Sequence, residues 1–337
     1  MVSQRSRLHR LIDAFRSQRV VLYGDLVLDR FILGSPKRIS REAPVIILTF
    51  EEQRDVPGGG ANALANIVSL GGTALPVAAV GDDEAGRTML AILAARGVDV
   101  GTVVVVPGYR TVTKVRLLAG GPASQRHQVA RYDIEDSLDP EGPWLANLLA
   151  AIERLAPTAG AAAISDYGYG VVSPEGVARL RAALPGGAPA VADSRFALTR
   201  LGTVDGATPN LEELAAVAGV MPRTDDAVAA AAEALRHRLG ARFVVATRGS
   251  KGLTLAQAEA GAAHIPVYGT DQVADVTGAG DTVLATLTLA IAAGASPLDA
   301  AQLANLAGGI VVMKLGTATV APEELHRAVD LAPFLHD

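Results

Sequence analysis

The sequence of 337 residues contains no cysteine. That absence excludes disulfides, thiolate metal sites and cysteine nucleophiles, and it fits a reducing compartment. The six histidines are scattered, and none forms a His-x-x-x-His pair. Nothing in the sequence therefore indicates a catalytic zinc site. A metal ion bound through oxygen ligands and phosphate groups stays open.

The chain also has little net charge and no long apolar run. Its formal charge of −5 gives no support to a broad nucleic-acid or anionic-membrane surface, although a local basic pocket is compatible with it. The amino terminus is basic but lacks an apolar core, and the best apolar stretch, 282–295, is shorter than the ~20 residues that span a bilayer. We expect a cytoplasmic protein that binds neither nucleic acid nor membrane.

Two common nucleotide-binding patterns are missing as well. No Gly-x-x-x-x-Gly-Lys-Ser/Thr occurs, which excludes an ordinary P-loop. No Gly-x-Gly-x-x-Gly follows the first predicted strand, so a nicotinamide dehydrogenase is a poor alternative. A nucleotide must therefore be held in another way.

Apolar runs of strand length alternate with longer helical patterns along most of the chain. The near-continuous hydrophobicity of these runs is typical of a parallel sheet covered on both faces. The predicted strands are 20–23, 75–80, 161–165, 190–192 and 243–246, and the predicted helices are 61–70, 85–96, 144–155, 174–183 and 225–239. This alternation predicts an α/β fold.

Two stretches, 31–56 and 109–133, interrupt the alternation with short β-prone segments and interleaved charges. We predict that 45–50 and 113–118 pair with one another in a small separate sheet above the open edge of the main domain. We interpret this sheet as a lid. An exposed lid sheet can pair with its twin, so a homodimer is expected.

The most informative segment is 275–281, Asp-Val-Thr-Gly-Ala-Gly-Asp, which opens a helix that is apolar on nearly every face. Such a helix must be central in the fold. Gly278 and Gly280 allow the backbone to approach a ligand, and the free N–H groups of the first turn form an anion site. The helix dipole should hold Asp281 ionised as a general base, a role typically worth ~10²- to 10⁴-fold in rate. The same residues also fit an ordinary helix start, where aspartate is common.

Two further clusters lie nearer the amino terminus. Residues 57–62, Pro-Gly-Gly-Gly-Ala-Asn, open a helix with a glycine-rich turn that can serve a phosphate, a sugar or close packing. Asp25 and Asp29 follow the first strand, and the carboxyl ends of parallel strands are where α/β sheets bind ligands. The alternative for these carboxylates is a solvated turn.

Segment 275–281 resembles the carboxy-terminal signature of the ribokinase-like (PfkB) carbohydrate kinases, and 57–66 resembles the family's amino-terminal sugar-binding signature. The resemblance covers nearly the whole chain. It implies one kinase domain, 1–337, with three α/β/α layers, a mainly parallel central sheet and a small β-sheet lid. It also implies an ATP-dependent enzyme that uses Mg²⁺, and in some members K⁺, to transfer the γ-phosphate to a sugar hydroxyl.

The resemblance implies a role for individual residues. The backbone of Gly278, Ala279 and Gly280 becomes an anion hole and Asp281 the catalytic base. The implied sugar-binding residues are Asp25, Asp29, Gly58, Gly59 and Asn62. The implied nucleotide-side residues are Asn210, Glu213 (which also organises Mg²⁺ indirectly), Thr247, Gly249, Gly252 and Asn305, with Asp275 and Thr277 near a monovalent cation. On local grounds Asn210 and Glu213 also fit a capping box, and Asn305 fits a buried amide that bonds to backbone.

Further stretches, 24–30, 38–44, 165–168 and 314–320, are similar to the kinases of ADP-heptose synthesis, which phosphorylate D-glycero-D-manno-heptose 7-phosphate at O1. A sugar that already carries a phosphate needs cationic receptors. Lys114 and Arg116 alternate with apolar neighbours and so point to one face. We prefer this pair to the other lid cations, Arg38, Arg110 and Arg126. Protection of exposed strand edges is the alternative role for each of these charges.

Two departures from the heptose kinases keep the substrate open. Tyr169 and Arg195 stand where that subgroup tends to have lysine, and only the second replacement leaves a cation. A kinase for another sugar or sugar phosphate therefore stays an alternative. A non-catalytic sugar or nucleotide sensor on the same fold is the alternative from a different class.

Overall fold

The computed structural model describes residues 3–120, 126–258, 260–269, 274–314 and 316–336. Within these residues the main sheet has eight strands in the order β14-β13-β12-β11-β10-β9-β1-β4. Their bounds are β1 (Arg19–Gly24), β4 (Thr73–Val77), β9 (Ala161–Asp166), β10 (Ala190–Ser194), β11 (Gly206–Ala207), β12 (Phe243–Thr247), β13 (Leu253–Gln257) and β14 (Gly261–Ile265). The strands from β12 to β4 are parallel, and β13 and β14 continue the sheet antiparallel. The predicted α/β fold is confirmed.

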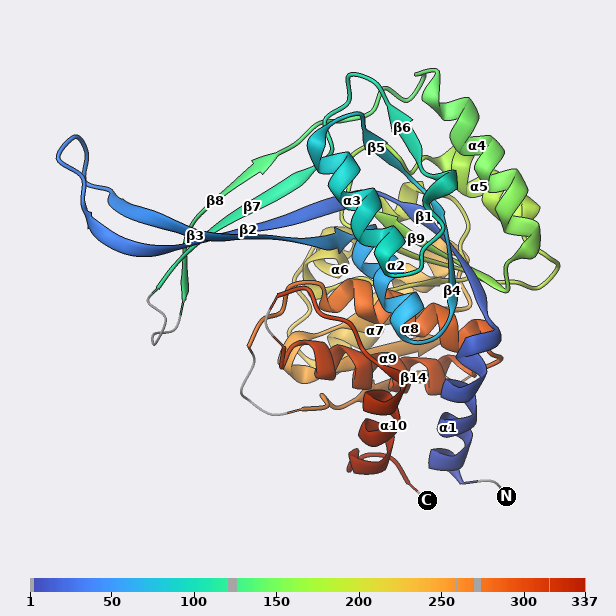
Figure 1. Ribbon diagram of the computed structural model, residues 1–337. Helices are drawn as coiled ribbons and strands as arrows, with labels where there is room; N and C mark the ends of the chain where they lie inside the picture. The colour runs from blue at the N-terminus through green and yellow to red at the C-terminus, as the bar shows by residue number, and fades with distance from the viewer. Residues whose placement is uncertain (1–2, 121–125, 259, 270–273, 315, 337) are drawn as a thin grey trace.

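Helices cover both faces of this sheet, as Figure 1 shows. Successive residues of β1 point to opposite faces, so Val20 and Leu22 join one apolar core while Val21 and Tyr23 join the other. The first core includes α1 (Gln4–Ala14), α2 (Gly60–Ser69), α3 (Glu84–Ala95), α8 (Ala279–Ala292), α9 (Pro297–Val311) and α10 (Pro322–Leu331). The second includes α4 (Trp144–Leu155), α5 (Pro174–Ala183), α6 (Leu211–Ala218) and α7 (Asp225–Leu239). This is the expected three-layer arrangement.

The five helices predicted from the apolar pattern are all present, with ends that agree to within one residue. The apolar pattern locates these helices well because capping residues mark the same ends. At the start of α5, for example, the Ser173 hydroxyl accepts from Gly176 N–H, and Pro174 is the first residue of the helix. Helix α8 is buried from Asp281 to Ala290, as its apolar faces predict, and it packs between α2 and α9. No helix in the described ranges is long and apolar enough to cross a membrane.

The predicted strand 75–80 is wrong in part. β4 ends at Val77, and the chain then leaves the main sheet. A separate strand, β5 (Ala79–Gly81), pairs in parallel with β6 (Val104–Val106) in a small two-stranded sheet.

A second sheet, which we call the lid, projects from the main domain (Figure 1) and has the strand order β3-β2-β7-β8. Its strands are β2 (Leu26–Ile39), β3 (Ile46–Gly59), β7 (Thr113–Ala119) and β8 (His127–Ile134). The predicted lid sheet therefore exists, but the predicted direct pairing of 45–50 with 113–118 is wrong. β2 lies between the two segments because it forms a local hairpin with β3 on one edge and pairs with β7 on the other.

Candidate active site

A cavity of about 350 Å³ lies where the main sheet, the base of the lid and the start of α8 meet. The carboxyl ends of parallel strands point into it, as in other α/β folds. Of the residues predicted from the sequence, the cavity is lined by Asp29, Gly59, Lys114, Arg116, Asn210, Glu213, Thr247, Thr277, Gly278, Gly280 and Asp281. Segments far apart in the sequence thus contribute to one site.

The turn before α8 has the geometry of an anion-binding site. Gly278 caps the helix with φ +80°, a left-handed conformation that favours glycine, and a Cβ at this position would collide with the Asn62 amide. Ala279 N–H donates to Val276 C=O (3.3 Å), whereas the structure gives no acceptor within the described chain for the N–H groups of Gly280 and Asp281. These two amides stand at the positive end of a 14-residue helix.

Asp281 lies in the first turn of α8 and is only 2 % exposed. The Tyr167 hydroxyl donates to its Oδ1 (2.9 Å), and Asn62 Nδ2 donates to its Oδ2 (3.2 Å). Burial raises the pKa of Asp281 to about 7, although both donors act in the opposite direction. Removal from water thus acts against the ionised form that the helix start and the two donors favour.

Tyr167, which the sequence did not single out, lies between two cations. Lys114 Nζ is 5.2 Å and Arg195 Cζ is 4.6 Å from the centre of its ring. Apart from these ring contacts, neither cationic group lies within ion-pair distance of a carboxylate in the described parts of the chain, although Asp29 acts on Lys114 and Arg195 acts on Glu213 from farther away. Burial, followed by the repulsion of Arg195, lowers the pKa of Lys114. Two unpaired cations facing one cavity are suited to an anionic ligand.

The other cations of the site have partners. Arg116 forms a close ion pair with Asp29, so these two predicted residues neutralise each other. Arg131, another residue that the sequence did not single out, lines the cavity and pairs with Asp133 (2.6 Å). The alternation that placed Lys114 and Arg116 on one face is confirmed, since both side chains line the cavity.

The remaining lid cations lie elsewhere. Arg110 bonds to the Glu135 carbonyl and lies near Asp136, and Arg126 pairs with Glu51. Arg38 is exposed and donates to the carbonyl of its neighbour, Ile39. At the two positions that depart from the heptose kinases, Tyr169 donates its hydroxyl to Glu135 (2.8 Å), while Arg195 lines the cavity.

Asp25 does not line the cavity, although it was predicted to bind sugar. Its buried carboxylate accepts the backbone N–H groups of Tyr167 (2.8 Å), Val171 (3.2 Å) and Tyr169 (3.3 Å). Burial raises the pKa of Asp25 to about 6. Asp25 thus holds the loop that carries Tyr167, and the alternative of a solvated turn is wrong.

The nucleotide side of the cavity begins with the first turn of α6. Asn210 and Glu213 form the complete capping box that their spacing permits, and Glu213 also faces the cavity. Asp193, at the end of β10, lies beside it and was missed as a site residue; the available signal was a carboxylate at the carboxyl end of a parallel strand. Burial, and then the nearby Glu213 and Asp281 charges, raises the pKa of Asp193 well above its ordinary value.

Several predicted residues lie outside the cavity wall. Gly249 and Gly252 form a turn after β12 with φ +57° and +77°. Asn305 is buried on α9 and donates to the Pro266 carbonyl (2.8 Å), the backbone bond that was its alternative. Asp275 accepts the N–H groups of Thr277 (2.9 Å) and Gly316 (3.2 Å), which ties the turn before α8 to the segment that follows α9. The cavity is likewise not lined by Gly58, Ala279 or Asn62, although the Asn62 side chain donates to Asp281, which lines it.

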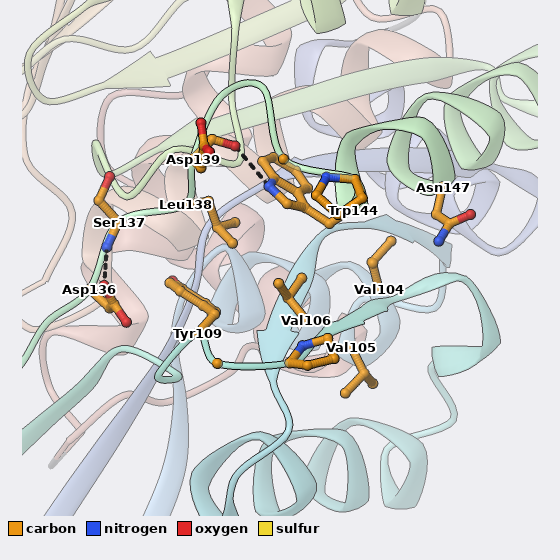
Figure 2. Close-up of a pocket in the computed structure, with 14 residues that line it drawn as sticks. Val104, Val105, Val106, Tyr109, Asp136, Ser137, Leu138, Asp139, Trp144 and Asn147 are labelled. Atoms are coloured by element: carbon orange, nitrogen blue, oxygen red, sulfur yellow. Dashed lines mark hydrogen bonds between the residues drawn. The ribbon is translucent and has the colours of Figure 1, made fainter.

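A second cavity, of about 500 Å³, lies beside β6 and the start of α4 (Figure 2). Its wall includes Val104, Val106, Leu138 and Trp144, and the Trp144 ring N–H donates to the Asp139 carbonyl (2.9 Å). None of the predicted site residues lines it. The carboxylates and cations that can do chemistry therefore gather in the smaller cavity.

The architecture is that of ribokinase-like proteins. The structure matches the phosphofructokinase-2 of Escherichia coli in complex with potassium with a TM-score of 0.74 and 22 % identity, covering 93 % of this chain and 98 % of that one. It matches the Arabidopsis thaliana ribokinase complexed with ribose and ATP with a TM-score of 0.72 and 20 % identity, covering 94 % and 99 %. These likenesses establish a ribokinase-like fold.

Residues 17–324 match the pfkB family of carbohydrate kinases, so the chain belongs to that family and is an ATP-dependent carbohydrate kinase. It is 41 % identical over 323 residues to the bifunctional protein HldE of Caulobacter vibrioides, covering 94 % of this chain and 65 % of the relative. It is 39 % identical to the bifunctional protein HldE of Paramagnetospirillum magneticum, covering 96 % and 66 %. The chain thus spans about two thirds of the length of these relatives.

Proposed function

We propose that the protein phosphorylates a sugar that already carries a phosphate, and that the substrate is D-glycero-D-manno-heptose 7-phosphate, phosphorylated at O1. The observation that carries this proposal is the pair of unpaired cations, Lys114 and Arg195, in the same cavity as Asp281. A neutral sugar gives no reason to bury a lysine that has no ion pair with a carboxylate, whereas a phosphate does. The likeness of several stretches to heptose kinases, and to the HldE proteins, supports the same substrate.

The mechanism follows from the arrangement of the cavity. The γ-phosphate lies against the turn before α8, where the N–H groups of Gly280 and Asp281 and the helix dipole stabilise the charge that develops during transfer. The ionised carboxylate of Asp281 takes the proton of the attacking sugar hydroxyl. Asp29 and Gly59, which line the cavity, hold the sugar. Gly58 and Asn62 lie outside the cavity and act indirectly, Asn62 through its bonds to Asp281 and Gly278, while Asp25 holds the loop that carries Tyr167. Thr247, which lines the cavity, contacts the nucleotide. Gly249 and Gly252 form the turn that follows its strand, and Asn305 supports this side of the site through its bond to the Pro266 carbonyl.

Two carboxylates of the cavity fit a magnesium ion. Asp193 and Glu213 are both partly shielded from water, and burial raises the pKa of each. A divalent cation bound between these carboxylates would stabilise their ionised forms and so lower both pKa values. The described residues contain no cluster of three or more metal-ligating side chains, which fits the way Mg²⁺ binds through one or two carboxylates and substrate phosphates. Mg²⁺ supplies charge neutralisation at the phosphates when it is bound.

Asp275 and Thr277 are the proposed residues for a monovalent cation such as K⁺. The Asp275 carboxylate accepts two backbone amides and still has lone pairs to offer. Close to the same turn, the Thr317 hydroxyl is buried without a hydrogen-bond partner in the described part of the chain. An ion at this turn would hold the anion-binding amides in place.

We also propose a cytoplasmic homodimer that associates through the lid. The lid exposes large apolar side chains that a monomer would leave in water; the side chain of Phe50, for example, is 65 % exposed. A second copy of the same sheet offers matching apolar and backbone groups. Sedimentation should therefore give a dimer at micromolar concentration, and Phe50→Asp should shift the protein toward monomers; a wild-type monomer would contradict this proposal.

The function is tested by measuring ATP consumption with a panel of sugars and sugar phosphates that includes heptose 7-phosphate. We expect the highest kcat/KM with a phosphorylated sugar, loss of activity when Mg²⁺ is chelated, and higher activity in K⁺ than in Na⁺. Preference for an unphosphorylated sugar would overturn the substrate assignment. Binding without turnover across the whole panel would favour a sensor, although such a protein has no need for Asp281.

A further inference from the structure

Two buried asparagines lie one helical turn apart on α2. Their side-chain hydrogen bonds connect the segment at Val320, after α9, to the turn before α8. Asn62 and Asn66 are 1 % and 0 % exposed. Asn62 Nδ2 donates to Asp281 Oδ2 (3.2 Å) and to the Gly278 carbonyl (3.1 Å). One amide group thus holds both the proposed base and the glycine that caps its helix.

The neighbouring asparagine reinforces the orientation of the Asn62 amide, which the Gly278 carbonyl, an acceptor only, already requires. Asn66 Nδ2 donates to Asn62 Oδ1 (3.2 Å) and to the Asn62 carbonyl (3.1 Å). The Asn66 oxygen in turn accepts the backbone N–H of Val320 (3.3 Å). A backbone N–H can only donate, so Asn66 must turn its oxygen toward Val320 and its NH₂ group toward Asn62. The Asn62 oxygen therefore faces a donor on Asn66, and this contact helps to keep the Asn62 NH₂ group toward Asp281.

We infer that Asn66 is a positioning residue for catalysis, which acts through Asn62 to keep an N–H donor, and not a carbonyl oxygen, against the catalytic base. This inference rests on the proposed function, in which Asp281 is the base. It gives Asn62 a role in place of the contact with sugar that the resemblance implied, since its amide is engaged by Asp281, Gly278 and Asn66. It also assigns a function to Asn66, a residue with no contact with the cavity.

The chemical consequence concerns the charge on Asp281. A donor on Oδ2 favours the ionised carboxylate, whereas a carbonyl oxygen in the same place would repel it and favour the protonated acid. Other ionisable groups act on Asp281 from the surrounding elements: Tyr167, Asp29, Asp193 and Arg195. None of them is altered by a substitution at Asn66, so a change in the ionisation of Asp281 would report on the asparagine relay.

The test is the pH dependence of kcat in Asn66→Leu and Asn66→Ala. The wild type should lose activity as the pH falls through about 7, because the base with a pKa of about 7 becomes protonated. In both variants the Asn62 amide loses the donor on its own oxygen and is held only by its bonds to Gly278 and Asp281. Loss of one directed hydrogen bond should move this acid limb upward by about 0.5 to 1 pH unit and lower kcat at pH 7 by roughly 3- to 10-fold, with little change in the KM for sugar.

Ser69→Ala is the matched control. The Ser69 hydroxyl also ties α2 to the segment after α9, through the Val320 carbonyl (2.8 Å), but it lies outside the relay. Its acid limb should stay at the wild-type pH. Asn66 variants that match Ser69→Ala, or that lose kcat without a shift of the limb, would overturn the inference. If the wild type shows no acid limb and Asp281→Asn still turns over, the failure lies with the proposed base instead.

A neutron structure of the wild-type protein tests the relay without any substitution, which covers the case of Asn66 variants that do not fold. Deuterons should appear on the Asn62 atom that faces Asp281 and on the Asn66 atom that faces Asn62. An oxygen at either place would overturn the inference.

Discussion

Asp281→Asn is expected to lower kcat by about 10²- to 10⁴-fold while the KM for sugar changes little. The substituted amide has nearly the shape of the carboxylate, and its oxygen can accept from Asn62 while its NH₂ group donates to the Tyr167 hydroxyl oxygen, so the cavity keeps its form. It has no lone pair that can take a proton from a hydroxyl at neutral pH. Steady-state kinetics with the best substrate of the panel measures both constants.

Asp299→Asn is a close control for this substitution. Asp299 is buried and occupies the equivalent position in the first turn of α9, but it pairs with Arg7 far from the cavity. Its loss should lower stability and leave kcat within about twofold of wild type. Near-normal turnover by Asp281→Asn would remove Asp281 from the mechanism.

The same variant has a second expected effect, on stability. The folded protein raises the pKa of Asp281 to about 7, so the native state binds this proton more tightly than the unfolded chain does. That carboxylate therefore costs stability above pH 7, and the cost disappears as the pH falls toward its ordinary value. Asp281→Asn should be more stable than wild type at pH 8, by on the order of 1–3 kcal/mol, and this advantage should shrink as the pH falls to 5 and disappear below the ordinary pKa of the carboxyl group.

Lys114→Met is expected to raise the KM for a phosphorylated sugar by about 10- to 100-fold, since a charge-assisted hydrogen bond contributes ~1.5–3 kcal/mol. Methionine keeps the apolar stem that packs in the lid, so the loss is mainly that of the ammonium group. The KM for ATP and the activity on unphosphorylated sugars should change little. Kinetics with a sugar and its phosphate, each at varied concentration, separate these effects.

Arg38→Met serves as the control for a charge removed from the lid. Arg38 lies on β2 but is exposed and outside the cavity, so its loss should leave both KM values near wild type. An increase in the KM for ATP in Lys114→Met, with the KM for sugar phosphate unchanged, would move Lys114 to the nucleotide and contradict its proposed role.

The helices and most strands of the main domain could be predicted from the sequence because their signal is local. Apolar periodicity and capping residues fix where an element begins and ends. The order of strands in the lid is not local: β2 pairs with β7, which brings Leu28 opposite Thr113. Nothing in 45–50 or 113–118 reveals that a strand will lie between them.

The residues of the site also fall into those that the local sequence predicts and those that only distant contacts bring into place. The glycine turn was readable because a missing Cβ and the free amides of a helix start are properties of a few consecutive residues. The roles of Asp25 and Tyr167 could not be predicted from the sequence, because Asp25 binds a loop more than 140 residues away and that loop brings Tyr167 to Asp281. The mutual neutralisation of Arg116 and Asp29 was hidden for the same reason.

The sequence by itself determined that this protein has an anion-binding helix start with an aspartate in its first turn, and that cations of the lid face one way. The tertiary structure decided the state of that aspartate. Burial, and the amides and hydroxyls that reach Asp281 from α2 and from the loop after β9, set its pKa and orientation. Water is excluded only when distant segments pack together, so this property belongs to the fold and to no single motif.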